Sequence, residues 1–221
     1  MEALAKLAQA ISSSRDPCAI VSKWMEYADL ARKSVVSLAT SFVRNKVVTT
    51  ISHSSAVREA LLSARPRKVI VLESRPGIEA LDLLSLLERS GIDVEPLPDS
   101  CIARAVSESD VVVIGADAVD IDGNVLNKVG SRTLAIAARY AGIPLVVVCE
   151  ALKISRTPCR DLEARVEWLY DIGGKSVRVR VFECVERELV TYLVTDLGLA
   201  KPCREILERM LEEVYERLGC A

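Results

Sequence analysis

The sequence is poor in aromatic residues, has a single histidine and contains no cysteine pair at the spacing of a metal site. Aromatic residues make up 4% of the 221 positions although 50% are hydrophobic, so the core must consist mainly of valine, leucine, isoleucine and alanine. The seven cysteines form no Cys-x-x-Cys pair and no cysteine–histidine cluster, which argues against zinc. We therefore expect neither a bound metal nor a cofactor.

A membrane-spanning segment and an export signal are also missing. No apolar run is long enough to cross a bilayer, and the first residues, MEALAKLAQAI, lack the charged start, apolar centre and cleavage site of a signal peptide. The expected compartment is the cytoplasm, where free thiols are the default. Arginine exceeds lysine and β-branched residues abound, which hints at a heat-loving source, and in such organisms a cytosolic disulfide becomes possible.

The chain carries no excess of charge of either sign. The net charge is −2 with 27% charged residues, so opposite charges are mixed rather than segregated. Nucleic-acid-binding proteins usually show a basic excess, so no direct contact with nucleic acid is expected, and without an apolar span none with a membrane. The length suits one large domain or two small ones.

The hydrophobic pattern changes from helical to alternating at residue 46. Residues 1–14 and 17–44 carry apolar positions at helical spacing, interrupted by Asp16-Pro17, a plausible cap followed by a first-turn proline. From there, strands alternate with helices, which predicts a Rossmann-like, mostly parallel α/β sheet with helices on both faces. We expect a helical amino-terminal segment at 1–45 and a Rossmann-like domain at 46–221, with strands at 47–51, 68–72, 94–97, 110–115 and 144–149, an edge strand at 176–184 and a final helix at 203–218.

The stretch from residue 110 to 133 is the first candidate for a ligand site. A β-branched run ends at Gly115, and Asp117 follows directly, before the turn sequence Asp122-Gly123-Asn124. Open α/β sheets build their ligand crevices at the carboxyl ends of such strands. Asp117 is the best acid–base candidate, because burial at a strand end would raise its pKa. The alternative is that it caps the turn.

A second polar stretch, Ser52-His53-Ser54-Ser55, follows the first strand and opens a helix. Free backbone N–H groups and hydroxyls at a helix start suit an anion such as a phosphate, although the same residues can serve as a plain cap. A lone histidine is more often structural than chemical. In a doubly wound sheet the first strand lies beside the fourth, which would place this stretch opposite Asp117, Asn127 and Lys128.

Two basic residues could complete such an anion site. Lys128 could hold a phosphate as a point charge or pair with a nearby aspartate on the surface. Arg75, at the end of the second strand, could close an anion clamp or hydrogen-bond loop carbonyls. A small phosphorylated ligand is the class that fits these groups.

Four motifs occur in one order: TTISHSSAV (49–57), ESRP (73–76), GADAVDIDGNVLNKVGS (115–131) and FECVERELVTYLVTDLG (182–198). In this order they resemble the family of the alpha, beta and delta regulatory subunits of translation initiation factor 2B. The same family includes methylthioribose-1-phosphate isomerase and ribose-1,5-bisphosphate isomerase. The third motif is the most specific, and the resemblance covers residues 30 to 200. It implies a homodimer formed through the Rossmann-like domain.

The chain departs from the isomerase pattern at several positions. The resemblance implies a catalytic aspartate at Asp117 and a cysteine at the position of Ser52, and a serine hydroxyl is a far weaker acid than a thiol. A family glycine and arginine correspond to Ala80 and Asp82. The amino-terminal helical region is shorter than in the isomerases and lacks an Arg-Gly-Ala phosphate-binding motif. Each departure removes an anion-binding or acid–base group.

Two interpretations of function follow. The first is an archaeal-type, non-catalytic relative of the initiation-factor subunits, with a pocket for a nucleotide or sugar phosphate and with initiation factor two or related subunits as partners. The second is an aldose–ketose isomerase acting on a ribose phosphate, with Asp117 and a substituted partner, such as His53, moving protons. The departures from the isomerase pattern favour the first.

Overall fold

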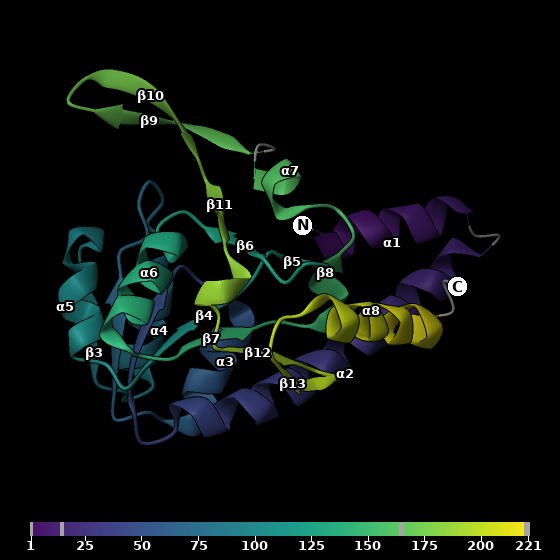
Figure 1. Ribbon diagram of the computed structural model, residues 1–221, viewed down its shortest axis with the longest axis horizontal. Coiled ribbons are helices and arrows are strands. Elements are labelled where there is room, and N and C mark those ends of the chain that lie inside the picture. The colour runs from purple at the N-terminus through teal and green to yellow at the C-terminus, as the bar shows by residue number, and fades with distance from the viewer. Residues whose placement is uncertain (1, 14–15, 164–165, 219–221) are drawn as a thin grey trace.

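A seven-stranded, almost entirely parallel sheet forms the centre of the molecule. The computed structural model describes residues 2–13, 16–163 and 166–218 (Figure 1). The strand order is β13-β12-β7-β4-β1-β2-β3, and only β13 is antiparallel to its neighbour. The predicted Rossmann-like fold is confirmed. The strands are β1 (Val47–Ile51), β2 (Lys68–Leu72), β3 (Val94–Leu97), β4 (Val111–Ile114), β7 (Leu145–Val148), β12 (Tyr192–Thr195) and β13 (Gly198–Ala200).

Helices cover both faces of this sheet, so its central strands are apolar along their whole length. All four residues of β4, and all four of β7, are buried, as expected where helices pack on each face. Successive side chains alternate between two cores, one under α3 and α4, the other under α5, α6 and α8. The helices are α3 (Ser55–Ala64), α4 (Ala80–Arg89), α5 (Ile102–Ser107), α6 (Ser131–Ala141) and α8 (Arg204–Leu218).

Two amino-terminal helices, α1 (Glu2–Ser13) and α2 (Pro17–Val43), precede the sheet. As the Asp16-Pro17 pair predicts, the Asp16 side chain caps α2 by accepting from the Ala19 amide at 3.0 Å. The buried side of α2 contributes to both cores with Trp24, Tyr27, Ala31, Val35, Ala39 and Val43. The amino-terminal helices thus share the core of the α/β part, while the predicted division at residue 46 stays a prediction.

A second, four-stranded sheet stands at the carboxyl rim of the first one. It has the order β11-β6-β5-β8 and is built from short strands that the sequence pattern did not predict. Its members are β5 (Ala118–Asp120), β6 (Val125–Lys128), β8 (Ile154–Ser155) and β11 (Phe182–Val185). The predicted turn at Asp122-Gly123-Asn124 joins β5 to β6, and the buried carboxylate of Asp120 holds it by accepting from the Asp122 and Asn124 amides. This small sheet carries Lys128 over the main rim.

An antiparallel ribbon of β9 (Glu167–Ile172) and β10 (Lys175–Arg180) stands out from the body (Figure 1). We call these two strands the arm. The prediction of a single edge strand at 176–184 is wrong. The strand β10 ends at Arg180, and the next strand, β11, pairs with β6 instead. A disulfide joins the segments that precede and follow the arm. It links Cys159, in the short helix α7 (Cys159–Glu163), to Cys184 in β11. The expectation of free thiols is therefore wrong for this pair.

The other cysteines that the structure describes are free, with Cys149 fully buried; Cys220 lies outside the described residues. Burial raises the pKa of the Cys149 thiol to about 12, so it is an inert core residue. Among the described residues no cluster of histidine, cysteine and acidic side chains has the arrangement of a metal site. None of the helices in the same residues is long and apolar enough to cross a membrane.

Candidate functional site

The loops that leave β1 and β4 lie side by side at one rim of the main sheet. The two strands pair in parallel, with Val48 beside Val111 and Thr49 beside Val112. Beyond them, Gly115 touches the start of α3 so closely that a Cβ atom on it would lie 2.5 Å from the Cβ of Ser54. The rim predicted from the strand order is therefore present, at the point where the topology of an open α/β sheet forms its crevice.

Two serines at this rim have an unusual backbone conformation. Ser52 directly follows β1, and Ser74 lies two residues beyond β2. Their φ angles are 66° and 69°, in the left-handed region that residues other than glycine rarely adopt. The Ser52 amide donates to the Ser74 hydroxyl at 2.6 Å, and the Ser74 amide donates to Asp99 at 3.0 Å. These bonds fix the backbone at Ser52 and Ser74, and so the point from which the Ser52 side chain leaves the chain.

Glu79 connects the two halves of the predicted site. Its Oε1 accepts a hydrogen bond from the Ser52 hydroxyl at 3.1 Å and lies 2.7 Å from the ammonium of Lys128. Lys128 is 3% exposed. Gly77 leaves the room for this contact, because a Cβ there would lie 2.9 Å from Lys128 Nζ. The sequence reasoning missed Glu79, although an acidic residue at the start of a helix that follows ESRP was the available signal.

Asp117 lies half-buried at the same rim, just beyond β4. Burial raises its pKa above the ordinary value, while the positive charges of Lys153 and Lys128 partly oppose that rise. Lys153 was not predicted as a site residue; its ammonium donates to the Ala116 carbonyl at 2.7 Å. The raised pKa agrees with the expectation for a carboxyl group buried at a strand end.

Replacing Asp117 with asparagine is expected to stabilise the protein at pH 7.5 and to lose this effect below pH ~4. The raised pKa means that the fold favours the protonated form of Asp117. Its contribution to stability is thus complete at acid pH and falls as the pH rises through the folded-state pKa. Urea unfolding of both proteins at the two pH values measures the difference. A variant less stable than the wild type at pH 7.5 would contradict the raised pKa of Asp117.

The stretch after Ser52 serves partly as a helix cap. Ser54 is the N-cap of α3 and accepts from the Val57 amide at 3.5 Å, while Ser55 is the first helical residue. His53 differs, because its Nε2 is buried without a hydrogen-bond partner among the described residues. Such an unsatisfied atom in a native protein calls for an explanation, and a bound ligand is one.

The structure gives Asn127 and Arg75 other partners. The Asn127 amide is buried and donates to the Ser131 hydroxyl at 2.8 Å, which ties β6 to α6. The exposed Arg75 guanidinium pairs with Glu73 at 3.3 Å. The amino terminus of α6 is also occupied, because the Glu183 carboxylate accepts from the Gly130 and Arg132 amides at 2.7 and 2.8 Å. Of the predicted groups, Ser52 and Lys128 are thus the pair that the structure brings to one point.

Comparison with known proteins decides the family. The family model described as the initiation factor 2 subunit family matches residues 8–202. The chain belongs to this family. A Pyrococcus furiosus relative, named as subunit 2-like of translation initiation factor eIF-2B, is 30% identical over 191 residues, spanning 84% of this chain and 69% of that protein. A ribose 1,5-bisphosphate isomerase of Archaeoglobus fulgidus is 30% identical, spanning 76% of this chain and 55% of that protein.

The fold of this family member also matches solved structures. The crystal structure of translation initiation factor eIF-2B from Pyrococcus horikoshii OT3 superimposes with a TM-score of 0.86 and 29% identity, covering 93% of this chain and 78% of that one. A translation-factor relative and an isomerase are therefore both similar to this chain in sequence, and the names of the relatives alone do not separate the two functions.

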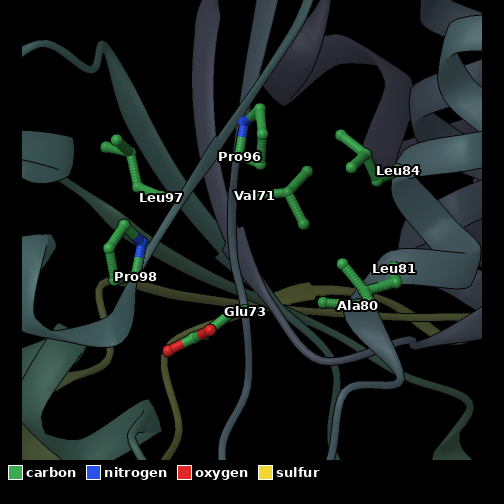
Figure 2. Close-up of a pocket in the computed structure, with 8 residues that line it drawn as sticks. All are labelled: Val71, Glu73, Ala80, Leu81, Leu84, Pro96, Leu97 and Pro98. Atoms are coloured by element: carbon green, nitrogen blue, oxygen red, sulfur yellow. The ribbon is translucent and has the colours of Figure 1, made fainter.

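A separate cavity of about 230 Å³ lies between α4 and the ends of β2 and β3 (Figure 2). In Figure 2, Glu73 stands at one end of an otherwise apolar lining. No residue predicted from the sequence as part of the site lines this cavity, and it offers no cation to a phosphate. It is therefore distinct from the site formed by Ser52, Glu79 and Lys128, which we call the rim site. The lining residues are Val71, Glu73, Ala80, Leu81, Leu84, Pro96, Leu97 and Pro98.

Proposed function

We propose that this family member is a non-catalytic binding protein of the initiation-factor type, with the rim site as its pocket for a small phosphorylated ligand. The observation that carries the proposal is the convergence of the Ser52 hydroxyl and the Lys128 ammonium on one carboxylate oxygen, Glu79 Oε1. A neutral donor and a cation aimed at a single anionic oxygen are the arrangement that binds a phosphate oxygen. Glu79 thus holds the place of a ligand in the free protein.

The chemistry of Ser52 supports binding rather than catalysis. By resemblance, Ser52 stands where the isomerases have a cysteine, and a hydroxyl does not form the poised anion that a thiol does. In this structure the hydroxyl donates to Glu79, and the neighbouring Lys128 is neutralised by the same carboxylate. One half of the acid–base pair that isomerisation needs is therefore missing.

An isomerase acting on a ribose phosphate is the second candidate, and one observation favours it. Burial raises the pKa of Asp117 at the rim, and a raised pKa makes a carboxylate a stronger base towards a substrate proton. In that case Asp117 would act on the sugar carbon next to the carbonyl, with His53 as the partner group.

An assay of ketose formation separates the two candidates. Wild type, Asp117→Asn and Ser52→Cys are each incubated with ribose 1,5-bisphosphate and with methylthioribose 1-phosphate. We expect no turnover by the wild type or by Asp117→Asn, and a rise in the melting temperature of the wild type with at least one phosphorylated ligand. Turnover by the wild type that falls at least about a hundredfold in Asp117→Asn would establish the isomerase instead.

We further propose that the protein acts as a homodimer that binds initiation factor two or related subunits in the cytoplasm. The similarity to proteins named as eIF-2B subunits supports this proposal. Analytical ultracentrifugation tests the dimer, and a pull-down with purified initiation factor two tests the partner. A monomer at micromolar concentration that captures no initiation factor would overturn both statements.

A further inference from the structure

The two strands of the arm pack very little against the body of the molecule. All residues of β9 and β10 are exposed except Tyr170 and Val179, which are half-buried. A two-stranded ribbon that nothing covers is at best marginally stable in water. The place of the arm in the molecule (Figure 1) therefore depends on what holds its two ends.

The Cys159–Cys184 disulfide holds these two ends together. Cys159 precedes β9 and Cys184 follows β10, so the 25-residue separation that the disulfide spans contains the whole arm. Between the disulfide and the arm, the Val181 amide donates to the Val166 carbonyl at 3.2 Å. A cross-link restricts the segment that it encloses. We therefore expect the arm to move more freely once the disulfide is opened.

The disulfide and Lys128 lie on the same face of the second sheet. In the antiparallel pair of β6 and β11, Cys184 stands opposite Leu126. Two residues further along, Phe182 stands opposite Lys128, and residues two apart in a strand share a face. The arm returns to Lys128 with Trp168, whose ring centroid lies 4.9 Å from the ammonium. The disulfide thus holds the segment that covers the cation of the rim site.

We propose that the Cys159–Cys184 pair is a site of thiol–disulfide exchange, and that its reduction releases Trp168 from Lys128 and opens the rim site to its phosphorylated ligand. Two groups contact the Lys128 ammonium, the Glu79 carboxylate at 2.7 Å and the indole of Trp168. A phosphate can displace the carboxylate, but the indole leaves only when the arm moves. The oxidised protein is therefore the closed form. This inference rests on the proposed function of the rim site.

The partner in the exchange is a dithiol reductant. One thiolate of the reductant attacks the Sγ of Cys184, which is the half-buried member of the pair, and Cys159 leaves as a thiolate that takes up a proton. The second thiol of the reductant then attacks the mixed disulfide. This step releases Cys184 as a thiol and leaves the reductant as a disulfide, so that two electrons and two protons pass to the protein. Disulfides of cytoplasmic proteins are often of this redox-sensing kind.

Hydrogen exchange of the arm and calorimetric titration with ribose 5-phosphate, each without and with dithiothreitol, test the proposal. Reduction of the wild type should speed amide exchange in residues 166–181 at least about tenfold. It should also tighten the binding of ribose 5-phosphate about fivefold, because the indole no longer covers Lys128. Trp168→Leu, with its disulfide intact, should already bind as tightly as the reduced wild type, and reduction should not tighten it further.

Two further variants serve as controls. The double variant Cys159→Ala, Cys184→Ala cannot form the disulfide, so it should match the reduced wild type in both measurements whether or not dithiothreitol is present. This result would exclude the free cysteines as the target of the reductant. Leu169→Ala changes a residue that is 74% exposed on the opposite face of β9 from Trp168. It should respond to dithiothreitol as the wild type does.

The outcomes separate this inference from the function on which it rests. If reduction leaves the affinity for ribose 5-phosphate unchanged, the disulfide is a structural tie only and the proposal is wrong, while the phosphate site stands. Weaker binding after reduction would also overturn it, because the arm would then support the site. If no form of the protein binds ribose 5-phosphate, the proposed phosphate site fails. Hydrogen exchange then still decides whether the disulfide holds the arm.

Discussion

Replacing Gly115 with alanine is expected to lower the free energy of unfolding by about 3 kcal/mol, at the upper end of the cost of overpacking. The new methyl group would lie 2.5 Å from both the Cβ and the Oγ of Ser54. Ser54 is the N-cap of α3, so its short side chain cannot swing away without moving the backbone or losing the cap. Urea unfolding of the variant and the wild type measures the loss.

The double variant Gly115→Ala, Ser54→Gly provides the control. Glycine is tolerated at an N-cap at a cost of only a few tenths of a kcal/mol, and here it removes the atoms that the new methyl group would meet. The double variant should therefore recover most of the stability that the single variant loses. Equal losses in the single and double variants would mean that the loops after β1 and β4 are not in contact.

Replacing Glu79 with glutamine is expected to cost about 3 kcal/mol, because it leaves the ammonium of Lys128 buried without a counter-charge. The two partners are unequally exposed: the Lys128 side chain is 4% exposed and that of Glu79 30%. Loss of the carboxylate is therefore more damaging than loss of the lysine. Lys128→Met should cost less, because the remaining Glu79 can turn towards water.

Chemical denaturation of Glu79→Gln, of Lys128→Met and of the double variant tests the interaction between Glu79 and Lys128. Since the double variant leaves no buried charge, its loss should be smaller than the loss in Glu79→Gln alone. Trp168 over the ammonium offsets part of the cost in Glu79→Gln, so combining this change with Trp168→Leu should increase the loss. Strict additivity of the Glu79 and Lys128 variants would show that the two side chains do not interact.

The strands of the main sheet were predictable because each one is encoded by a short, contiguous run of apolar residues. Buried runs such as Val111–Ile114 are apolar on both sides, and the turns between them carry glycine, proline or a cap. The second sheet was not predicted, because its strands are two to four residues long and, apart from the pair β5 and β6, they pair with segments distant in the sequence. Val125–Lys128 was not among the predicted strands, yet it becomes a buried strand when β11 and β5 pair with it.

The site was predictable only in part, for a similar reason. Ser52 and Lys128 could be placed at one rim from the strand order alone. The position of Glu79 depends on how the loop after β2 folds back past Gly77, which no periodic pattern encodes. The contact of Trp168 with Lys128 likewise depends on where the arm lies, and that follows from the pairing of β11 with β6.

Titration of the wild type, Glu79→Gln and Lys128→Met with ribose 5-phosphate at pH 7.5 tests the phosphate site most directly. If Glu79 holds the place of a phosphate oxygen, removing its charge frees Lys128 and Ser52, so Glu79→Gln should bind about tenfold tighter than the wild type even though it is less stable. Lys128→Met should show no measurable binding. Unchanged affinity in both variants would show that phosphate does not bind between Ser52 and Lys128.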